Sequence, residues 1–105
     1  EDPALDFAPS PGRITQWQPP SGIGIRLDSH VYPGYEIPSF YDSLLGKLIV
    51  RVDDRADALA KSRLALDRFR VEGVATTIPF HRTLLDDHEF LAGDIHTGWV
   101  EARAA

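Results

Sequence analysis

Strand-like segments come first in this chain of 105 residues, and helix-like segments follow them. The first half holds short stretches in which apolar and polar residues alternate, separated by turns rich in proline and glycine. After Asp54 the apolar positions instead repeat with the spacing of a helix. This order favours an α+β fold, in which a small antiparallel sheet of about three strands is followed by helices. We expect a single domain over residues 1–105, because a chain of this length fits one modest core.

Three segments are expected to form strands, at residues 13–18, 23–32 and 43–52. In the second segment, alternation along the strand places Arg26 and Asp28 together on the less apolar face. The third segment is rich in β-branched residues towards its end and is expected to be buried. Residues 1–12 contain three prolines, so we expect an extended arm there.

The clearest helix prediction covers residues 55–69. Asp54 is the expected N-cap, and Gly73 is the expected stop signal. An apolar stripe follows the helical spacing, and it consists of Ala58, Leu59, Ser62, Ala65, Leu66 and Phe69.

Shorter helical segments are expected in the last third of the chain. Thr76 or Thr77 is the expected cap of a second helix, which has Pro79 in its first turn. A turn and a short helix follow it, and the pair Trp99 and Val100 is the last apolar feature of the chain.

The composition excludes several classes of protein. Sixteen acidic and eleven basic residues give a formal net charge of −5, which argues against nucleic acid or an anionic membrane as a partner. The absence of cysteine excludes a disulfide scaffold and thiolate metal sites, and it suits a reducing cytoplasm. No apolar run approaches the ~20 residues of a membrane span. We therefore expect a cytoplasmic protein with neither nucleic acid nor membrane as a partner.

Arg26 is the strongest candidate for chemistry. It keeps its charge at all physiological pH values, and its planar fork suits a carboxylate, a phosphate or a developing oxyanion. The alternative is a structural ion pair with Asp28 on the same strand face, and the residues by themselves favour this alternative.

Other motifs carry weaker signals. Gly22 and Gly24 open no phosphate-binding loop, so a role in turning and close packing is expected for them. The four histidines show no metal-binding spacing, and no metal site is expected; they are His30, His81, His88 and His96. No serine stands in a nucleophile elbow, so an independent hydrolase has no support.

The chain resembles the C-terminal domain of biotin carboxylase. The resemblance rests on SPGRITQW, GIGIRLDSHVYPGYEIPSFYDSLLGKLIVRVDDR, VEGVATTIPFHRTLL and HTGWVE, which cover essentially the whole chain in unbroken order. The blocks RLDSHVYPGY and YDSLLGKLIV are specific in combination. Biotin carboxylase occurs in bacterial acetyl-CoA and acyl-CoA carboxylases and within pyruvate carboxylase. The opening Glu-Asp-Pro also matches the family, so the chain is expected to begin just inside this domain, with the ATP-grasp part absent.

The resemblance implies ATP-dependent carboxylation of biotin by bicarbonate. In the family, ATP and bicarbonate form carboxyphosphate, and the N1 nitrogen of carrier-bound biotin captures the released CO₂. Arg26 stands where the family has an arginine over the biotin ureido oxygen and the bicarbonate or phosphate site. Its implied role is to stabilise negative charge on the ureido oxygen when N1 is deprotonated. The resemblance therefore reverses the preference for a purely structural Arg26.

The resemblance also implies parts and partners outside the chain. The upstream domains of biotin carboxylase bind ATP and Mg²⁺ and supply the bicarbonate-binding residues and the general base, so the chain alone is expected to be inactive. Biotin arrives on a biotin carboxyl carrier protein or domain. A separate carboxyltransferase component then selects the final acceptor.

Two contact surfaces are implied as well. Members of the family form homodimers, and the corresponding region here contains Arg51, Asp53 and Arg55. Other members carry an aromatic-glycine pair there, so charged pairs across a two-fold axis are the expected replacement. A patch against the upstream domains is expected at Trp17, Phe40 and Tyr41. A non-catalytic module for packing and dimerisation is the alternative function.

Overall fold

The computed structural model describes residues 1–39 and 44–104. Within these residues the strands pair two by two, in three antiparallel sheets. The strands are β1 (Gly12–Arg13), β2 (Gln16–Gln18), β3 (Ile25–Ser29), β4 (Glu36–Ile37), β5 (Gly46–Val50) and β6 (Arg70–Glu72). The helical elements are the 3₁₀ helix η1 (Pro3–Leu5) and the helices α1 (Arg55–Arg68), α2 (Ile78–Leu85), α3 (His88–Leu91) and α4 (Trp99–Ala104).

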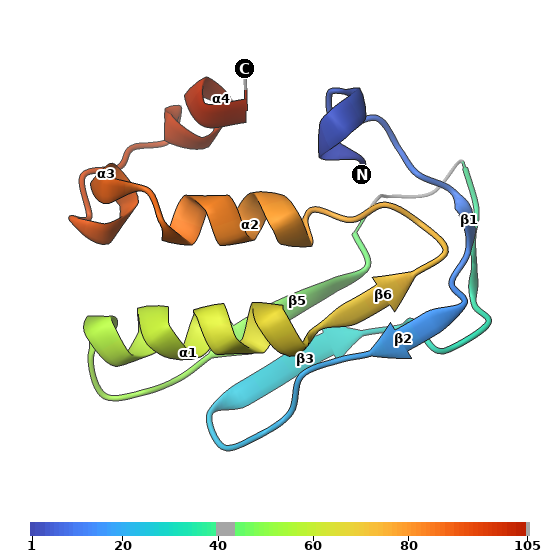
Figure 1. The fold of residues 1–105 in the computed structure, drawn as a ribbon, viewed down its shortest axis with the longest axis horizontal. Helices are drawn as coiled ribbons and strands as arrows, with labels where there is room; N and C mark the ends of the chain where they lie inside the picture. The colour runs from blue at the N-terminus through green and yellow to red at the C-terminus, as the bar shows by residue number, and fades with distance from the viewer. Residues whose placement is uncertain (40–43, 105) are drawn as a thin grey trace.

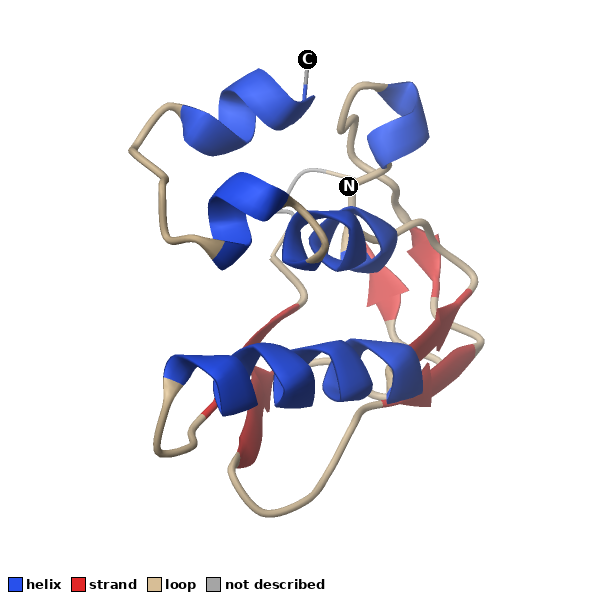
Figure 2. Cartoon of the chain, turned by 60° about the vertical axis from the view of Figure 1, so that its left-hand side comes forward, coloured by secondary structure: helices blue, strands red, loops and turns tan. Residues whose placement is uncertain are grey.

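The predicted α+β class is confirmed, with one difference in how the strands are arranged. The sheets are β1–β4, β2–β6 and β3–β5, so the described strands form separate pairs and no continuous three-stranded sheet. Helix α1 contacts both β5 and α2, and α2 contacts α3. The helices therefore form a second layer next to the strands, with both chain termini on the same side of the molecule (Figures 1 and 2).

The strand expected at residues 13–18 is divided in two at Ile14. Arg13 pairs with β4, whereas Gln16 pairs with β6, so the chain changes partner between them. The backbone of Ile14 still bonds to the β4 side, since its N–H donates to the carbonyl of Tyr35 at 2.9 Å. Its side chain is fully buried. The change of partner thus places an apolar anchor between two sheets.

Strand β6 was not expected, and it changes the interpretation of Gly73. The helix α1 ends before β6, so Gly73 does not stop it. Instead, Gly73 has a φ of +103°, and a Cβ atom there would lie 2.1 Å from the carbonyl oxygen of Arg13. Glycine is required because two backbone segments cross at this point.

Helix α1 begins at the predicted residue and packs through the predicted stripe. The carboxylate of Asp54 accepts a hydrogen bond from the N–H of Asp57 at 2.8 Å, as expected of an N-cap. Ala65 in the middle of the stripe is completely buried. Two arginine–carboxylate pairs then join α1 to α2 and the residue that follows it, namely Arg63 with Asp86 and Arg82 with Asp67.

Helix α2 starts as predicted, but its N-cap residue lacks the usual side-chain hydrogen bond. Thr77 makes no side-chain cap bond, and the hydroxyl of Thr76 accepts from the N–H of Ile78 at 3.3 Å. The buried residues of this helix are Leu84 and Leu85.

Other expectations differ from the structure. Residues 1–12 are not fully extended, because Asp2 caps the short helix η1 through the N–H of Ala4 at 2.9 Å. The side chain of Ile23 lies outside β3 and is 92% exposed. Strand β5 is not buried throughout, since its residues alternate between half-buried and exposed. No helix of the described residues has the length and apolar character needed to cross a membrane.

The C-terminal end of the chain is held by a group that we call the C-terminal clasp: Asp87, Glu89, Trp99 and Arg103. The Arg103 guanidinium bonds to Asp87 through Nε at 2.8 Å and also to Glu89. The indole N–H of Trp99 donates to Glu89 at 2.7 Å, and Arg103 lies 4.9 Å from the Trp99 ring centroid. The clasp fastens α4, which was not predicted, to α3.

The C-terminal clasp predicts that a mutation of Arg103 changes the pKa of Asp87. Desolvation raises the pKa of Asp87, but the N–H of Glu89 and the Arg103 guanidinium outweigh it and hold the pKa below its ordinary value. Arg103→Gln is therefore expected to raise the pKa of Asp87, as measured by NMR titration of its carboxyl carbon. The matched variant Arg13→Gln removes the exposed ion pair between Arg13 and Glu36, and it should leave the pKa of Asp87 unchanged.

The sign of the stability effect follows from the direction of the shift. Because the pKa of Asp87 is lower in the folded chain than in the unfolded chain, its contribution is complete above about pH 4. The contribution is lost as the pH falls through the folded pKa. An unchanged pKa in the Arg103→Gln variant would show that the ion pair does not hold this carboxylate.

Candidate functional site

Arg26 lies on the outer face of the β3–β5 sheet. In the antiparallel register Ile25 pairs with Val50, Leu27 with Leu48 and Asp28 with Lys47. The apolar positions Ile25, Leu27, Leu48 and Val50 are half-buried, whereas Arg26, Asp28, Lys47 and Ile49 are exposed. The predicted alternation is therefore confirmed within β3, and it directs Arg26 away from the core.

The structure places Arg26 beside Asp28, as the structural alternative predicted. The Arg26 Nη2 atom donates to Asp28 Oδ2 at 3.2 Å. The two side chains nevertheless remain 69% and 54% exposed. The ion pair is thus exposed to solvent, and only one N–H group of the guanidinium bonds to Asp28. The other N–H groups remain able to meet an acceptor from outside the chain.

The start of β3 is fixed by a close backbone contact at Gly24. Its φ is +79°, and an added Cβ would lie 2.4 Å from the carbonyl oxygen of Arg51. The N–H of Arg51 donates to the Gly24 carbonyl at 2.7 Å. The expected role of Gly24 in close packing is confirmed, and the contact holds the backbone two residues before Arg26.

The other end of β3 is fixed in a similar way. The Ser29 hydroxyl donates to the Leu45 carbonyl at 2.5 Å and accepts from the N–H of Val31 at 3.1 Å. A Cβ at Gly46 would lie 3.1 Å from that of Ser29. Gly46 therefore marks a close contact, and the regular register shows no bulge in the described β3–β5 pair. Arg26 sits between two fixed points of a short sheet.

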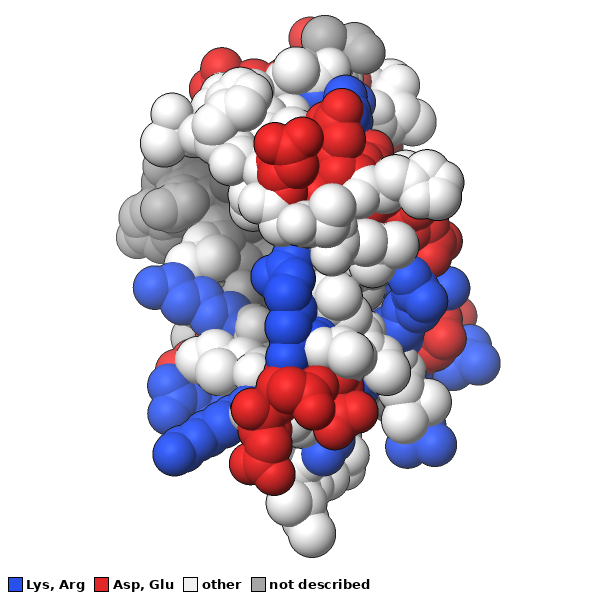
Figure 3. Space-filling model, turned by 90° about the vertical axis from the view of Figure 1, so that its left-hand side faces the viewer, with Lys and Arg blue, Asp and Glu red and all other residues white. Residues whose placement is uncertain are grey.

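The three residues expected at a dimer contact lie between β5 and the start of α1. Arg51, Asp53 and Arg55 are all exposed. Arg55 is also engaged within the chain, since its Nη2 donates to the carbonyl of Phe90 at 2.5 Å and its guanidinium lies 5.4 Å from the Phe90 ring centroid. Figure 3 views the side on which α1 begins and shows acidic and basic side chains next to one another there.

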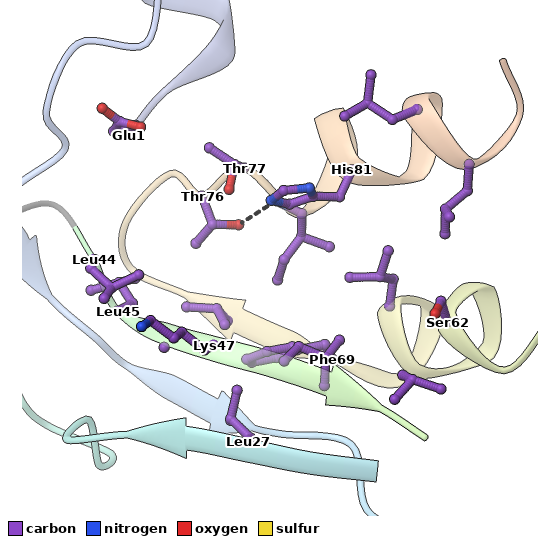
Figure 4. Close-up of a pocket in the computed structure, with 18 of the residues that line it drawn as sticks. Glu1, Leu27, Leu44, Leu45, Lys47, Ser62, Phe69, Thr76, Thr77 and His81 are labelled. Carbon is purple, nitrogen blue, oxygen red and sulfur yellow. Dashed lines mark hydrogen bonds between the residues drawn. The ribbon is translucent and has the colours of Figure 1, made fainter. Parts of the chain in front are cut away.

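A cavity that the sequence did not reveal lies between α1, α2 and the strands, with a volume of about 890 Å³. Its lining is mostly apolar and includes Leu27, Leu48, Leu66 and Phe69. The polar groups come from Glu1, Lys47, Ser62, Thr76, Thr77 and His81 (Figure 4). Partial burial lowers the pKa of His81, so its ring is neutral at pH 7. Because the lining comes from segments that are distant in sequence, only the tertiary fold could have revealed it.

Trp17, which was expected in an exposed contact patch, is not an exposed residue. This side chain is half-buried and packs edge-to-face on Phe69, with ring centroids 5.3 Å apart. It lines the cavity, so it does not form an exposed patch. Phe40 and Tyr41 lie outside the described residues.

The described residues include no group of three or more histidines and carboxylates that could hold a metal ion. Among the described residues Arg26 uses one N–H group for Asp28, and its other N–H groups fit a neutral or anionic oxygen.

Comparison with known proteins identifies the family. The model of the family described as biotin carboxylase C-terminal domain matches residues 1–102. The chain belongs to this family. Among relatives, this biotin carboxylase C-terminal domain is 48% identical over 101 residues to a pyruvate carboxylase subunit from Methanothermobacter thermautotrophicus, covering 96% of the chain and 21% of that protein. It is equally 48% identical over 101 residues to the biotin carboxylase of Nostoc, covering 96% of the chain and 23% of that protein.

A solved structure agrees with the domain in three dimensions. It is the biotin carboxylase domain dimer of the 2-oxoglutarate carboxylase of Hydrogenobacter thermophilus, in complex with MgADP, ADP and bicarbonate. The TM-score is 0.93 and the identity 40%, covering 98% of this chain and 23% of that chain. The biotin carboxylase C-terminal domain described here therefore spans less than a quarter of the length of these relatives.

Proposed function

We propose that this domain contributes Arg26 to the ATP- and bicarbonate-dependent carboxylation of carrier-bound biotin in a biotin-dependent carboxylase. The observation that carries the proposal is the exposed guanidinium of Arg26, presented from a strand that is fixed at both ends. Membership of the family supports the reaction, and the bicarbonate and MgADP complex of the Hydrogenobacter relative supports its co-substrates.

The proposed chemistry of Arg26 is electrostatic. Biotin supplies a ureido ring whose oxygen gains negative charge when the neighbouring nitrogen becomes a nucleophile. The guanidinium keeps its own proton and donates N–H groups to that oxygen. Because the strand holds the backbone, little reorganisation is needed when the charge develops. Replacing Arg26 by alanine in a complete biotin carboxylase that contains this domain tests the proposal, since turnover must fall while assembly is unchanged.

The remaining components belong to other parts of such an enzyme. ATP, Mg²⁺ and bicarbonate are proposed to bind in upstream biotin carboxylase domains. Biotin is proposed to arrive on a carrier protein or domain, and a carboxyltransferase component to select the acceptor. The relatives are named for pyruvate and for 2-oxoglutarate, so the acceptor varies among proteins that share this domain. Plant relatives named as chloroplastic show that cellular location varies as well, and we propose the cytoplasm for this protein.

The chain of 105 residues by itself is expected to show no carboxylase activity. One arginine cannot place ATP, metal and bicarbonate together, and the parts of biotin carboxylase that would do so are proposed to lie in upstream domains. The measurement is release of phosphate from ATP by the purified chain, with and without bicarbonate and free biotin. Phosphate release that depends on both would contradict the prediction.

A non-catalytic role in packing and dimerisation is the second candidate. The exposed segment with Arg51, Asp53 and Arg55 favours it, and the Hydrogenobacter relative is described as a dimer. If this were the main role, variants at Arg26 would change assembly, as measured by sedimentation, and leave the turnover of the assembled enzyme intact.

A further inference from the structure

We propose that the aromatic side chains directly after β3 bind the arm that links biotin to its carrier. We call His30, Tyr32 and Tyr35 the ring cluster. The inference rests on the proposed function of Arg26, because it takes the ureido oxygen of biotin to lie at that guanidinium. It adds the place where the rest of the carrier-bound substrate meets this domain, and hence a means of preferring carrier-bound biotin to free biotin.

The ring cluster is a connected set of aromatic side chains at the surface. The rings of His30 and Tyr35 meet edge to face with centroids 5.3 Å apart, and those of Tyr32 and Tyr35 do the same at 5.3 Å. Tyr35 is half-buried, whereas His30 is exposed and Tyr32 is 59% exposed. Exposed rings of this kind are characteristic of binding surfaces, since they bury a large area at a low cost in conformational entropy.

The backbone that carries the two tyrosines is anchored to the core through Ile14. The N–H of Ile14 donates to the carbonyl of Tyr35 at 2.9 Å, and the N–H of Gly34 donates to the carbonyl of Ile14 at 2.8 Å. The side chain of Ile14 is completely buried. A further bond, from the N–H of Tyr35 to the carbonyl of Tyr32 at 3.0 Å, closes the turn. Because the turn is fixed, a bound molecule has little backbone to order.

The guanidinium of Arg26 leans towards the end of β3 at which the ring cluster begins. Its Nη2 atom contacts Asp28 Oδ2 at 3.2 Å, and Asp28 lies two residues nearer to that end. At the other end of β3, the backbone of Gly24 lies against the carbonyl of Arg51. A substrate with its oxygen at Arg26 therefore has an exposed path along the strand, past Asp28 to His30.

The length of the arm is comparable to this path. His30 follows Arg26 by four residues, and four residues of extended strand span roughly 13 Å. In carrier-bound biotin a valeryl chain is joined by an amide to a lysine side chain. About eleven bonds, each of roughly 1.5 Å and arranged in a zigzag, then reach on the order of 13 Å. Free biotin ends at the carboxylate of the valeryl chain, so it stops short of the ring cluster.

The chemistry of the arm also suits these side chains. The arm consists of methylene groups interrupted by one amide, and it carries no charge. Aromatic rings bury methylene groups, while the hydroxyl of Tyr32 and the ring nitrogens of His30 can bond to the amide. No permanent charge lies in the ring cluster, so phosphate and bicarbonate would find no strong partner there. The arm is therefore the part of the substrates that the ring cluster fits.

Tyr32→Ala in a complete biotin carboxylase that contains this domain tests the inference. We compare kcat/KM for the biotinylated carrier with kcat/KM for free biotin. The ratio of the two is expected to fall roughly tenfold, mainly through a higher KM for the carrier, because an exposed binding ring is lost. His30→Ala should lower the ratio in the same direction. Tyr32→Phe keeps the ring, so its ratio should stay within about twofold of the parent value.

Ile23→Ala is the matched control for the direction of the arm. Ile23 is 92% exposed and lies just before β3, at the end opposite to the ring cluster. Its removal should leave the ratio unchanged. A loss that is selective for the carrier in Ile23→Ala, with none in Tyr32→Ala, would show that the arm leaves by the other end and would overturn the inference.

Results at Arg26 keep this inference apart from the proposed function. Arg26→Ala is expected to lower kcat with both forms of biotin, since both bring the ureido oxygen. If it does so, and Tyr32→Ala affects both forms equally or neither form, the role of the ring cluster is overturned and the proposed function stands. If Arg26→Ala leaves turnover unchanged, the proposed function fails, and the inference fails with it.

Discussion

Replacing Arg26 by alanine in a complete biotin carboxylase is expected to lower kcat by roughly 100- to 1000-fold. Loss of one preorganised donor to a developing oxyanion has effects of this size, because the charge then lacks its stabilising partner. The structure supports such a role, since the guanidinium is 69% exposed and leaves a strand held by Gly24 and Ser29. The measurement is steady-state carboxylation of free biotin at saturating ATP and bicarbonate.

Arg26→Lys is the control that separates charge from shape. Lysine keeps the positive charge but loses the planar fork, so an intermediate loss of kcat is expected. Sedimentation of both variants must match that of the parent enzyme. A kcat for Arg26→Ala within about twofold of the parent value would remove Arg26 from the reaction, since a lost donor costs far more.

Replacing Trp99 by alanine is expected to destabilise the chain by about 3–5 kcal/mol, as is typical of large aromatic side chains removed from a core. Trp99 is only 3% exposed, it packs against Phe90 with ring centroids 5.9 Å apart, and its indole N–H bonds to Glu89. Removal of the indole would leave a cavity, and the C-terminal clasp would lose the contacts of Trp99 with Glu89 and Arg103. The free energy of unfolding in urea measures the effect.

Val100→Ala is the matched control for this prediction. Val100 is the next residue of α4 and is 47% exposed, so a change of less than about 0.5 kcal/mol is expected. Equal stability of the two variants would show that α4 does not pack on the rest of the chain as the structure has it.

Features that are determined by residues close together in the sequence were predicted correctly. Helix α1 was predicted with its cap, because Asp54 and the apolar stripe act within a few turns of one another. The pairing of Arg26 with Asp28 was also foreseen, since the alternation of a strand is a local property.

Features that depend on distant partners could not be predicted in the same way. The partners of the strands and the existence of β6 depend on residues far apart in the chain. The requirement for Gly73 depends on the approach of Arg13, and the short helix α4 depends on contacts of Trp99 with α3. Short helices have little stability of their own, so tertiary contacts decide whether they form.

In the candidate site, the sequence allowed us to predict Arg26 and its pairing with Asp28. It did not reveal the contacts that fix the two ends of β3, nor the cavity. A φ of +79° at Gly24 and the position of the Arg51 carbonyl exist only in the folded chain. The apolar cavity walls were visible only as ordinary core residues. Periodicity indicates which side chains are hidden, but it does not indicate how completely the layers fill the space between them.

The pairing of β2 with β6 has a consequence for how this polypeptide reaches its native state. The N–H of Thr15 donates to the carbonyl of Glu72, and the N–H of Ala75 donates to Ser10, which lies 65 positions earlier. Contacts between such distant positions slow folding, because a large loop must close before they form. During synthesis on the ribosome, β2 therefore has to wait for its partner until residues 70–75 have emerged from the exit tunnel.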